Sequence, residues 1–190
     1  MYTNTNQPVI GYPDAHWGGC VKDRRSYTGY AFLLGGSVIS WKSQKQRSVA
    51  LLSTEAEYVS LAEATEEAIG LRSLLLEIGL DDFSRITLLV DNRSAILLAS
   101  DSVFHAQTKH NDIKHHFIRD VISEGFVILL HTPTNEMGAD VLTKALPRQT
   151  YRRSLQDLGM IDLEKDESAS YTTAIARDVT STWHIRCRVC

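Results

Sequence analysis

The chain has 190 residues, 43% of them hydrophobic and 23% charged, with a formal net charge of −3. This is the composition of an ordinary globular protein with one core. The sequence has no apolar run near the roughly 20 residues that span a bilayer and no signal-peptide core in its first residues, and its three cysteines favour a reducing compartment; we therefore expect neither a membrane protein nor a secreted one.

The first half of the chain predicts three strands and a long helix. Residues 9–17 indicate a strand, although Pro13 cannot donate a ladder hydrogen bond and prefers a sheet edge or a bulge. Residues 29–34 and 37–42 are short apolar runs around two glycines, which is typical of a β-hairpin. A helix is predicted over residues 53–78, ending at Gly79.

In the second half, strands alternate with helices. Residues 86–90 form a continuous apolar run, which predicts a strand buried on both faces, and residues 126–130 predict another strand. Helices are predicted over residues 94–100, 108–124, 134–146 and 149–158. Strands joined through helices run parallel, so we expect a five-stranded mixed α/β sheet, three antiparallel strands followed by two parallel ones, flanked by helices. We assign residues 9–160 to this domain, 1–8 to an extension and 161–190 to a poorly ordered tail.

One acidic residue lies on the apolar face of the long helix. Seven positions with helical spacing share that face, and six of them are apolar; the set is Glu57, Leu61, Ala64, Ala68, Leu71, Leu75 and Ile78. Because a buried carboxylate is costly, Glu57 needs a partner, a proton or a cation. This is the first indication of a functional site.

Three other acids are expected close to Glu57. Asp14 lies in the first strand, Asp91 ends the first parallel strand, and Asp140 lies early in the last long helix. Ligands bind at the carboxyl ends of parallel strands, and clustered carboxylates repel one another unless cations are present. Oxygen ligands suit Mg²⁺, with Mn²⁺ as a substitute, and two such ions can cleave a phosphodiester.

Each acid also has an ordinary structural explanation. Asp14 beside Pro13 can be a turn acid, and Asp91 can begin a turn. Thr54 and Glu57 fit a helix capping box, and Asp140 with Lys144 fits a surface pair at i,i+4 spacing. Together, however, these explanations require four separate coincidences at positions that one fold would bring together.

Seven segments, taken in order, make the pattern specific: GYPDAHWGG at 11–19, RSYTGY at 25–30, ISWKSQKQ at 39–46, STEAEY at 53–58, VDNRSAI at 90–96, TKHNDI at 108–113 and ADVLTK at 139–144. Over roughly residues 9–160 the chain resembles the ribonuclease H domain of Ty1/copia-type LTR retrotransposon polyproteins, which follows the reverse transcriptase. The resemblance implies a ribonuclease H-like fold and cleavage of the RNA strand of RNA–DNA hybrids during reverse transcription.

Carried over residue by residue, the resemblance implies two divalent ions held by Asp14, Glu57, Asp91 and Asp140. Glu57 is preferred to Glu55 because it follows Ala56 as in the family and lies along the apolar face. Contacts to the substrate are expected from Ser53, Asn92, Ser94, Lys109 and His110, the first three through 2′-hydroxyl groups.

The implied partners are the RNA–DNA hybrid and the reverse transcriptase part of a parent polyprotein, of which we expect the chain to be a fragment. The implied location is a cytoplasmic retroelement particle, with the nucleus as a second location, and no membrane.

The sequence departs from the family at three positions. His16 stands where a second aspartate is common, Leu52 replaces a serine, and Gly138 replaces an apolar residue just before Asp140. A glycine early in a helix costs ~1 kcal/mol relative to alanine, which would loosen the placement of Asp140. The Gly-His loop of cellular and retroviral enzymes has no counterpart here, and His131 is the nearest histidine.

Two alternatives remain open. A decayed copy would keep the fold as a nucleic-acid-binding or connection module, and an integrase-like strand-transfer enzyme would place its third acid differently. Trp17, Trp41 and Tyr58 are expected in the core, and the terminal Cys187 and Cys190 lack the further ligands that a zinc site needs.

Overall fold

The computed structural model describes residues 8–100 and 109–160, and of residues 109–113 it describes the backbone only. The elements are β1 (Val9–His16), β2 (Tyr27–Leu34), β3 (Ser37–Lys45), α1 (Ser53–Glu77), η1 (Asp81–Phe83), β4 (Ile86–Val90), α2 (Arg93–Ser100), α3 (Lys109–Ser123), β5 (Val127–His131), η2 (Thr134–Glu136), α4 (Asp140–Thr143) and α5 (Arg148–Asp157). The expected tail lies outside the described residues, as do residues 1–7 of the expected extension. In the two described ranges no helix has the length and apolar character to cross a membrane.

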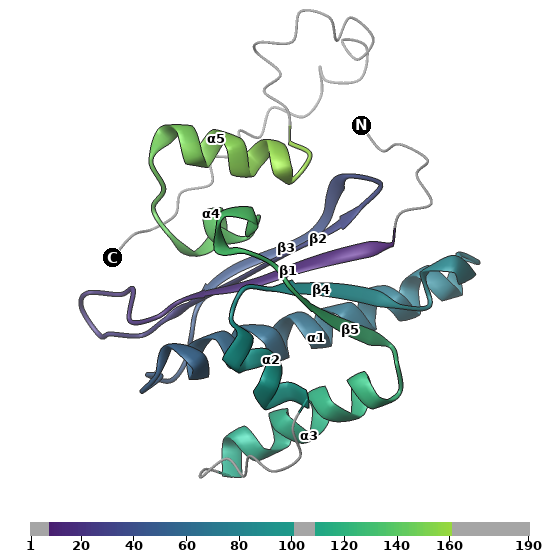
Figure 1. Ribbon diagram of the computed structural model, residues 1–190, viewed down its shortest axis with the longest axis horizontal. Coiled ribbons are helices and arrows are strands. Elements are labelled where there is room, and N and C mark those ends of the chain that lie inside the picture. The colour runs from purple at the N-terminus through teal and green to yellow at the C-terminus, as the bar shows by residue number, and fades with distance from the viewer. Residues whose placement is uncertain (1–7, 101–108, 161–190) are drawn as a thin grey trace, which may run out of the picture.

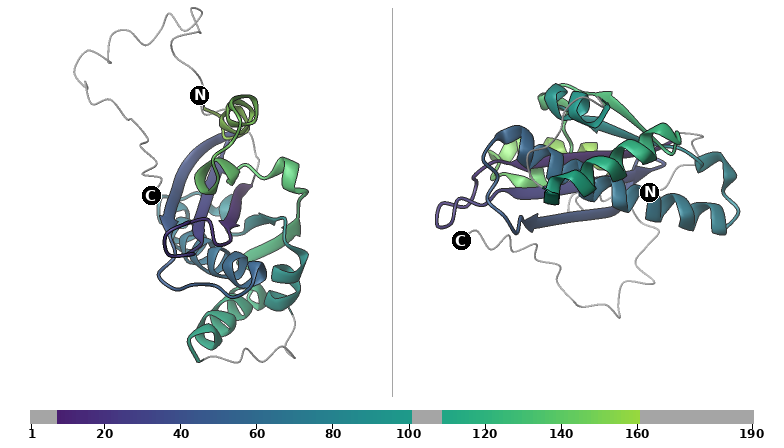
Figure 2. Two further views of the ribbon diagram at one scale, coloured as in Figure 1. Left: turned by 90° about the vertical axis from the view of Figure 1, so that its left-hand side faces the viewer. Right: turned by 90° about the horizontal axis from the view of Figure 1, so that it is seen from below.

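Five strands form one sheet in the order β3-β2-β1-β4-β5. The β1–β2 and β2–β3 pairs are antiparallel, and the β1–β4 and β4–β5 pairs are parallel, as predicted. Helices α1, α2 and α3 lie on one face, and α4 and α5 lie on the other (Figures 1 and 2). The ladder between β1 and β4 ends at Gly11, so Pro13 lies beyond it although β1 is the central strand.

Alternating side chains of β2 build a core on each face of the sheet. Tyr30 and Phe32 belong to the large cluster with α1 and α3, whereas Ala31 and Leu33 pack with Leu158 beside α4. Strand β4 alternates in the same way: Ile86, Leu88 and Val90 are buried, and the residues between them are half-buried. The expected burial of β4 on both faces is therefore only partly correct.

On the predicted face of α1, Leu61, Ala64, Ala68 and Leu75 are buried and Leu71 is half-buried, whereas Ile78 lies beyond the helix and is exposed. The helix begins without a side-chain cap, and Thr54 lies inside it, so the capping box is absent. The Glu55 carboxylate instead accepts the Leu51 backbone N–H at 2.8 Å. The two candidate glutamates thus have different environments, and capping is not the role of Glu57.

The helix predicted over residues 134–146 is wrong. The chain forms the short helix η2, becomes extended at Met137 and forms the four-residue helix α4. Met137, Gly138 and Ala139 are buried, and a Cβ atom at Gly138 would lie 3.2 Å from Leu158 Cδ2. Close packing thus replaces helical hydrogen bonding here, and the helical cost expected for Gly138 does not apply.

Candidate metal centre

Asp14 is fully buried in β1, opposite Gly29 of β2. A Cβ atom at position 29 would lie 2.7 Å from Thr143 Cγ2 and 2.9 Å from Leu142 Cβ. The missing side chain therefore allows α4 to lie close against β2. In that position the Thr143 hydroxyl donates a hydrogen bond to Asp14 Oδ2, so a glycine on one strand orients a carboxylate on its neighbour.

Glu57 is positioned by contacts between α1 and the sheet. One turn later in the helix, the buried Ser60 hydroxyl donates to the Asp14 carbonyl oxygen at 2.7 Å, with the Gly29 carbonyl oxygen at 3.2 Å. The Glu57 carboxylate accepts the backbone N–H of Ala15. These contacts hold the first turns of α1 against the carboxyl end of β1.

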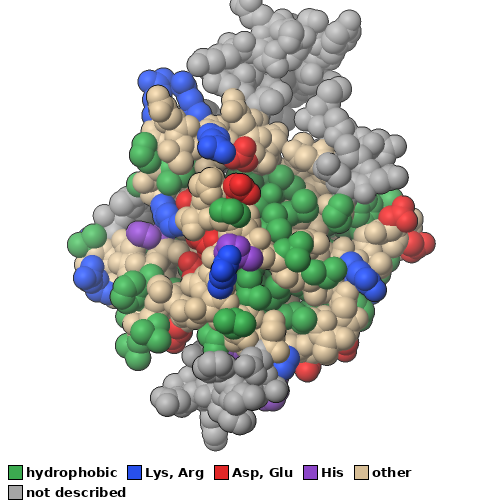
Figure 3. Space-filling model, in the orientation of Figure 1, with side chains coloured by type: hydrophobic (Ala, Val, Ile, Leu, Met, Phe, Trp, Pro, Cys, Tyr) green, Lys and Arg blue, Asp and Glu red, His purple; other side chains and the backbone are tan. Residues whose placement is uncertain are grey.

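Asp91 follows the last residue of β4, the parallel neighbour of β1. The next residue, Asn92, accepts the Ala95 N–H on its side-chain oxygen at 3.1 Å and so caps α2. Within the described ranges, one carboxylate oxygen from each of Asp14, Glu57 and Asp91 lies within 4.8 Å of the others. Acidic surface is visible left of the centre of the molecule, with Lys, Arg and His side chains around it (Figure 3).

Asp140 is not one of these three acids, but the side chain of Lys144 links it to Asp14. The Lys144 ammonium lies 2.7 Å from Asp140 Oδ1 and 3.4 Å from Asp14 Oδ1. The i,i+4 pair considered from the sequence therefore exists, and the same lysine also reaches the buried aspartate. The ammonium therefore competes with a metal ion for Asp140 Oδ1.

Burial makes the carboxyl groups of Glu57 and Asp14 reluctant to ionise. Desolvation, together with the nearby Asp14 and Asp91, raises the pKa of Glu57 to about 9. Desolvation also raises the pKa of Asp14 to about 6, although Lys144 and the Thr143 hydrogen bond act in the opposite direction. A cation would relieve this repulsion, and three carboxylates offer the oxygen ligands that Mg²⁺ and Mn²⁺ prefer. The donor set of Asp14, Glu57 and Asp91 therefore fits such an ion.

The other predicted site residues lie at or near the first residues of α1 and α2, or have side chains outside the described ones. Ser53 begins α1 and Ser94 lies in the first turn of α2, and both are exposed. The backbones of Lys109 and His110 begin α3, but their side chains are not among the described ones. The substrate contacts predicted for these residues and for Asn92 stay predictions.

His16 and His131 do not belong to the cluster that Asp14, Glu57 and Asp91 form. His16 is exposed and packs over Gly19, where a Cβ atom would meet its ring. His131 is exposed at the end of β5.

Sequence reasoning missed the residues that support the centre. Ser60, Thr143 and Lys144 contact Asp14 directly. The signal for Thr143 was its place in the segment ADVLTK, and Lys144 stood out only as a surface partner of Asp140. The core packing expected for Tyr58 is correct, but Trp17 and Trp41 are each 52% exposed. The prediction that both tryptophans lie in the core is therefore wrong.

No family model matches the chain. It is similar to the Retrovirus-related Pol polyprotein from transposon TNT 1-94 of Nicotiana tabacum, with 40% identity over 156 residues, which cover 82% of this chain and 12% of that protein. It is also similar to the Retrovirus-related Pol polyprotein from transposon RE2 of Arabidopsis thaliana, with 38% identity over 150 residues, covering 79% of this chain and 10% of that protein. The chain thus spans about a tenth of the length of these curated relatives.

Solved ribonuclease H structures share the fold. LC11-RNase H1, isolated from compost by a metagenomic approach, matches with a TM-score of 0.54 at 16% identity, over 78% of this chain and 98% of that one. LC11-RNase H1 in complex with an RNA/DNA hybrid matches with a TM-score of 0.50 at 17% identity, over 71% of this chain and 93% of that one. From its relatives and its fold, the chain belongs to the ribonuclease H domains of Ty1/copia-type retrotransposon Pol polyproteins.

Proposed function

We propose that this domain is a divalent-metal-dependent endonuclease that hydrolyses the RNA strand of RNA–DNA hybrids. The observation that carries the proposal is the approach of the Asp14, Glu57 and Asp91 carboxylates to within 4.8 Å, at the ends of two neighbouring parallel strands and the start of a helix. Burial raises the pKa of Asp14 and of Glu57, and a divalent cation bound between the carboxylates would offset the cost of ionising them together.

Two divalent ions bound to these carboxylates would supply an activated water and stabilisation of the departing 3′ oxygen. The protein's own residues orient the ligands. Thr143 directs one oxygen of Asp14, and the Ala15 N–H directs Glu57. Lys144 holds a positive charge beside Asp14, where the phosphate of a substrate would add negative charge.

Exposed polar groups next to the acids suit recognition of RNA. Ser53 lies four residues before Glu57, on the same side of α1, and Ser94 lies three residues after Asp91. The Asn92 oxygen caps α2, and its NH₂ group remains able to donate. Such groups can contact the 2′-hydroxyls in the wide minor groove of the hybrid, which distinguish RNA from DNA.

The relatives support the biological setting of the proposal. They are Pol polyproteins, and LC11-RNase H1 has been solved with an RNA/DNA hybrid. We therefore place this domain in a parent polyprotein beside a reverse transcriptase, acting in a cytoplasmic retroelement particle. Mg²⁺ is the proposed ion, Mn²⁺ its substitute, and Asp140 the proposed fourth ligand once Lys144 has moved.

The test is cleavage of an RNA–DNA hybrid labelled on both strands, with Mg²⁺, Mn²⁺ or EDTA, by the natural protein and by Asp91→Asn. The proposal predicts metal-dependent cleavage of the RNA strand only, lost in Asp91→Asn. A folded protein that cuts in neither metal would support the decayed module. Cutting of duplex DNA would support the integrase-like enzyme.

A further inference from the structure

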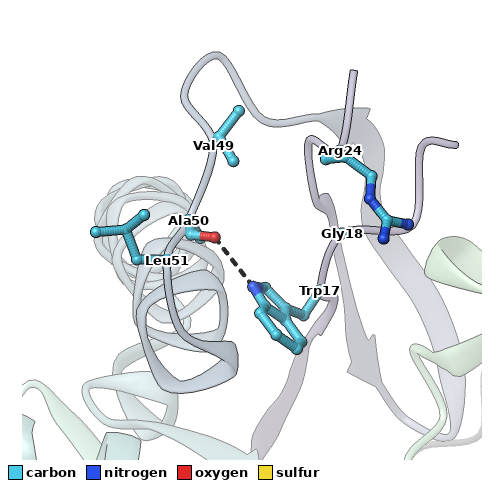
Figure 4. Close-up of a pocket in the computed structure, with 6 residues that line it drawn as sticks. All are labelled: Trp17, Gly18, Arg24, Val49, Ala50 and Leu51. Carbon is cyan, nitrogen blue, oxygen red and sulfur yellow. Dashed lines mark hydrogen bonds between the residues drawn. The ribbon is translucent and has the colours of Figure 1, made fainter. Parts of the chain in front are cut away.

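The loops beside the metal centre expose apolar side chains that the proposed reaction does not use. A pocket of about 260 Å³ lies between the β1–β2 and β3–α1 connections, and it is lined by Trp17, Gly18, Arg24, Val49, Ala50 and Leu51 (Figure 4). Trp17 is 52% exposed and Leu51 is 81% exposed. Apolar side chains gathered at the surface in this way are typical of a binding site.

The indole of Trp17 is held in place by the neighbouring connection. Its Nε1–H donates to the Ala50 carbonyl oxygen at 3.0 Å (Figure 4), and Ala50 packs in a small buried cluster with Ala15 and Ala56. A large ring that is fixed before a ligand arrives loses little side-chain entropy on binding. The exposed indole of Trp17 is therefore pre-organised for binding.

Positive charge is concentrated around this pocket. The two connections that form the pocket, residues 17–26 and 46–52, contain four Lys and Arg and one Asp, in a chain whose net charge is −3. Lys22, Arg24 and Arg47 are exposed, and Arg24 lies on the side of the pocket opposite Ala50 (Figure 4). An aromatic side chain beside clustered cations suits a nucleic acid strand, because the ring contacts sugars and bases while the cations attract phosphates.

The residues that line the pocket lie a short way along the chain from two of the clustered acids. Trp17 follows Asp14 by three residues, and Leu51 precedes Glu57 by six. Three residues span at most about 10 Å, which is the length of roughly three steps of a nucleic acid strand at ~3.4 Å each. A strand with one phosphate at the carboxylates can therefore reach Trp17 within a few nucleotides.

We propose that Trp17, Leu51 and Arg24 form a contact surface for the substrate strand within about three nucleotides of the cut. Trp17 and Leu51 cover sugars and exposed base edges, and Arg24 meets a phosphate. The occupant is the hybrid, so the inference rests on the proposed function. Contacts of this kind add affinity and set the position of the strand without selecting a sequence.

The first measurement is hybrid affinity, by fluorescence anisotropy in EDTA, for the natural protein, Trp17→Leu and Trp41→Leu. Trp41 is the matched control, because it is also 52% exposed but lies on the edge strand β3. We expect affinity to fall about tenfold in Trp17→Leu and to stay unchanged in Trp41→Leu. In Arg24→Gln, the slope of log affinity against log salt should decrease by about one.

Leu51→Ser is a second variant of the same surface, and it should fold normally because Leu51 is largely exposed. A folding defect in Trp17→Leu would therefore not decide the test. We expect Leu51→Ser to weaken hybrid binding about threefold. In cleavage assays Trp17→Leu should raise KM and leave kcat unchanged. Trp17→Leu and Leu51→Ser proteins that bind the hybrid as tightly as Trp41→Leu would overturn the proposal. So would loss of self-association in Trp17→Leu with no change in hybrid affinity, since it would assign the surface to a second copy of the chain.

These results are distinguishable from failure of the proposed function. If the natural protein does not cleave the hybrid, the proposed function fails. If it cleaves the hybrid and Trp17→Leu binds as tightly as the natural protein, only the contact surface is wrong.

Discussion

Gly29→Ala should separate α4 from the metal centre. The added Cβ atom would lie 2.7 Å from Thr143 Cγ2 and 2.9 Å from Leu142 Cβ, whereas ordinary contacts begin at 3.4 Å. Helix α4 must therefore move outward by several tenths of an ångström. This movement strains the bond from the Ser43 hydroxyl to the Leu142 carbonyl, now 2.6 Å long, and the bond from Thr143 to Asp14. Overpacking of this kind costs about 1–3 kcal/mol.

The assay is urea unfolding of Gly29→Ala in EDTA and in Mg²⁺, with Gly70→Ala as the control. Gly70 lies inside α1, and a Cβ atom there meets nothing within 4 Å, so this variant should gain about 1 kcal/mol from helix propensity. The same Gly→Ala substitution should thus lower the free energy of unfolding at position 29 and raise it at position 70. Gly29→Ala should also need more Mg²⁺ for half of the metal-linked stabilisation. Unchanged stability and Mg²⁺ dependence would refute the proposed role of Gly29.

Three further predictions concern the same centre. In EDTA, the free energy of unfolding should fall from pH 6 to pH 8, by at most about 1.4 kcal/mol per pH unit for one proton. The reason is the raised pKa of Glu57, about 9, which keeps a proton on the folded protein that the unfolded chain has lost. Urea unfolding would show this fall, Mg²⁺ should reverse it, and a flat profile would contradict the prediction. Lys144→Met should lose about 1–3 kcal/mol of stability in EDTA, because the buried Asp14 loses its nearby cation. It should gain more thermal stability from Mg²⁺ than the natural protein, and an equal gain in both would argue against the ammonium occupying that position. Ser60→Ala should lose about 1 kcal/mol of stability, because the hydrogen bond that holds α1 to the Asp14 carbonyl oxygen is gone. It should also bind Mg²⁺ more weakly in a calorimetric titration. Full Mg²⁺ affinity would mean that other contacts suffice to place Glu57.

The sheet topology was predictable because it depends on local patterns. Period-two and continuous apolar runs indicate strands, and the helices between the later strands require parallel connections. The convergence of Asp14 and Asp91 followed from that topology, since the ends of neighbouring parallel strands meet. Glu57 stood out because it interrupts an apolar helical face, and the structure places it within 4.8 Å of both aspartates.

The supporting contacts were not predictable from local patterns, because they depend on segments far apart in the sequence. Helical spacing over residues 134–146 does not reveal that Met137 and Gly138 are buried, or that Gly138 packs against Leu158 just after α5. Lys144 has the spacing of an ordinary surface pair with Asp140, and only the position of α4 shows that it reaches Asp14. Trp17 is hydrophobic by type, but its exposure depends on where two loops meet.

The most direct test of the metal centre is a calorimetric Mn²⁺ titration of the natural protein, Glu57→Gln and Glu55→Gln. The two variants make the same chemical change two residues apart, one beside Asp14 and Asp91 and the other at the start of α1. The account predicts that the natural protein and Glu55→Gln bind Mn²⁺ and that Glu57→Gln loses most of its affinity. Undiminished binding by Glu57→Gln, or no binding by the natural protein, would contradict it.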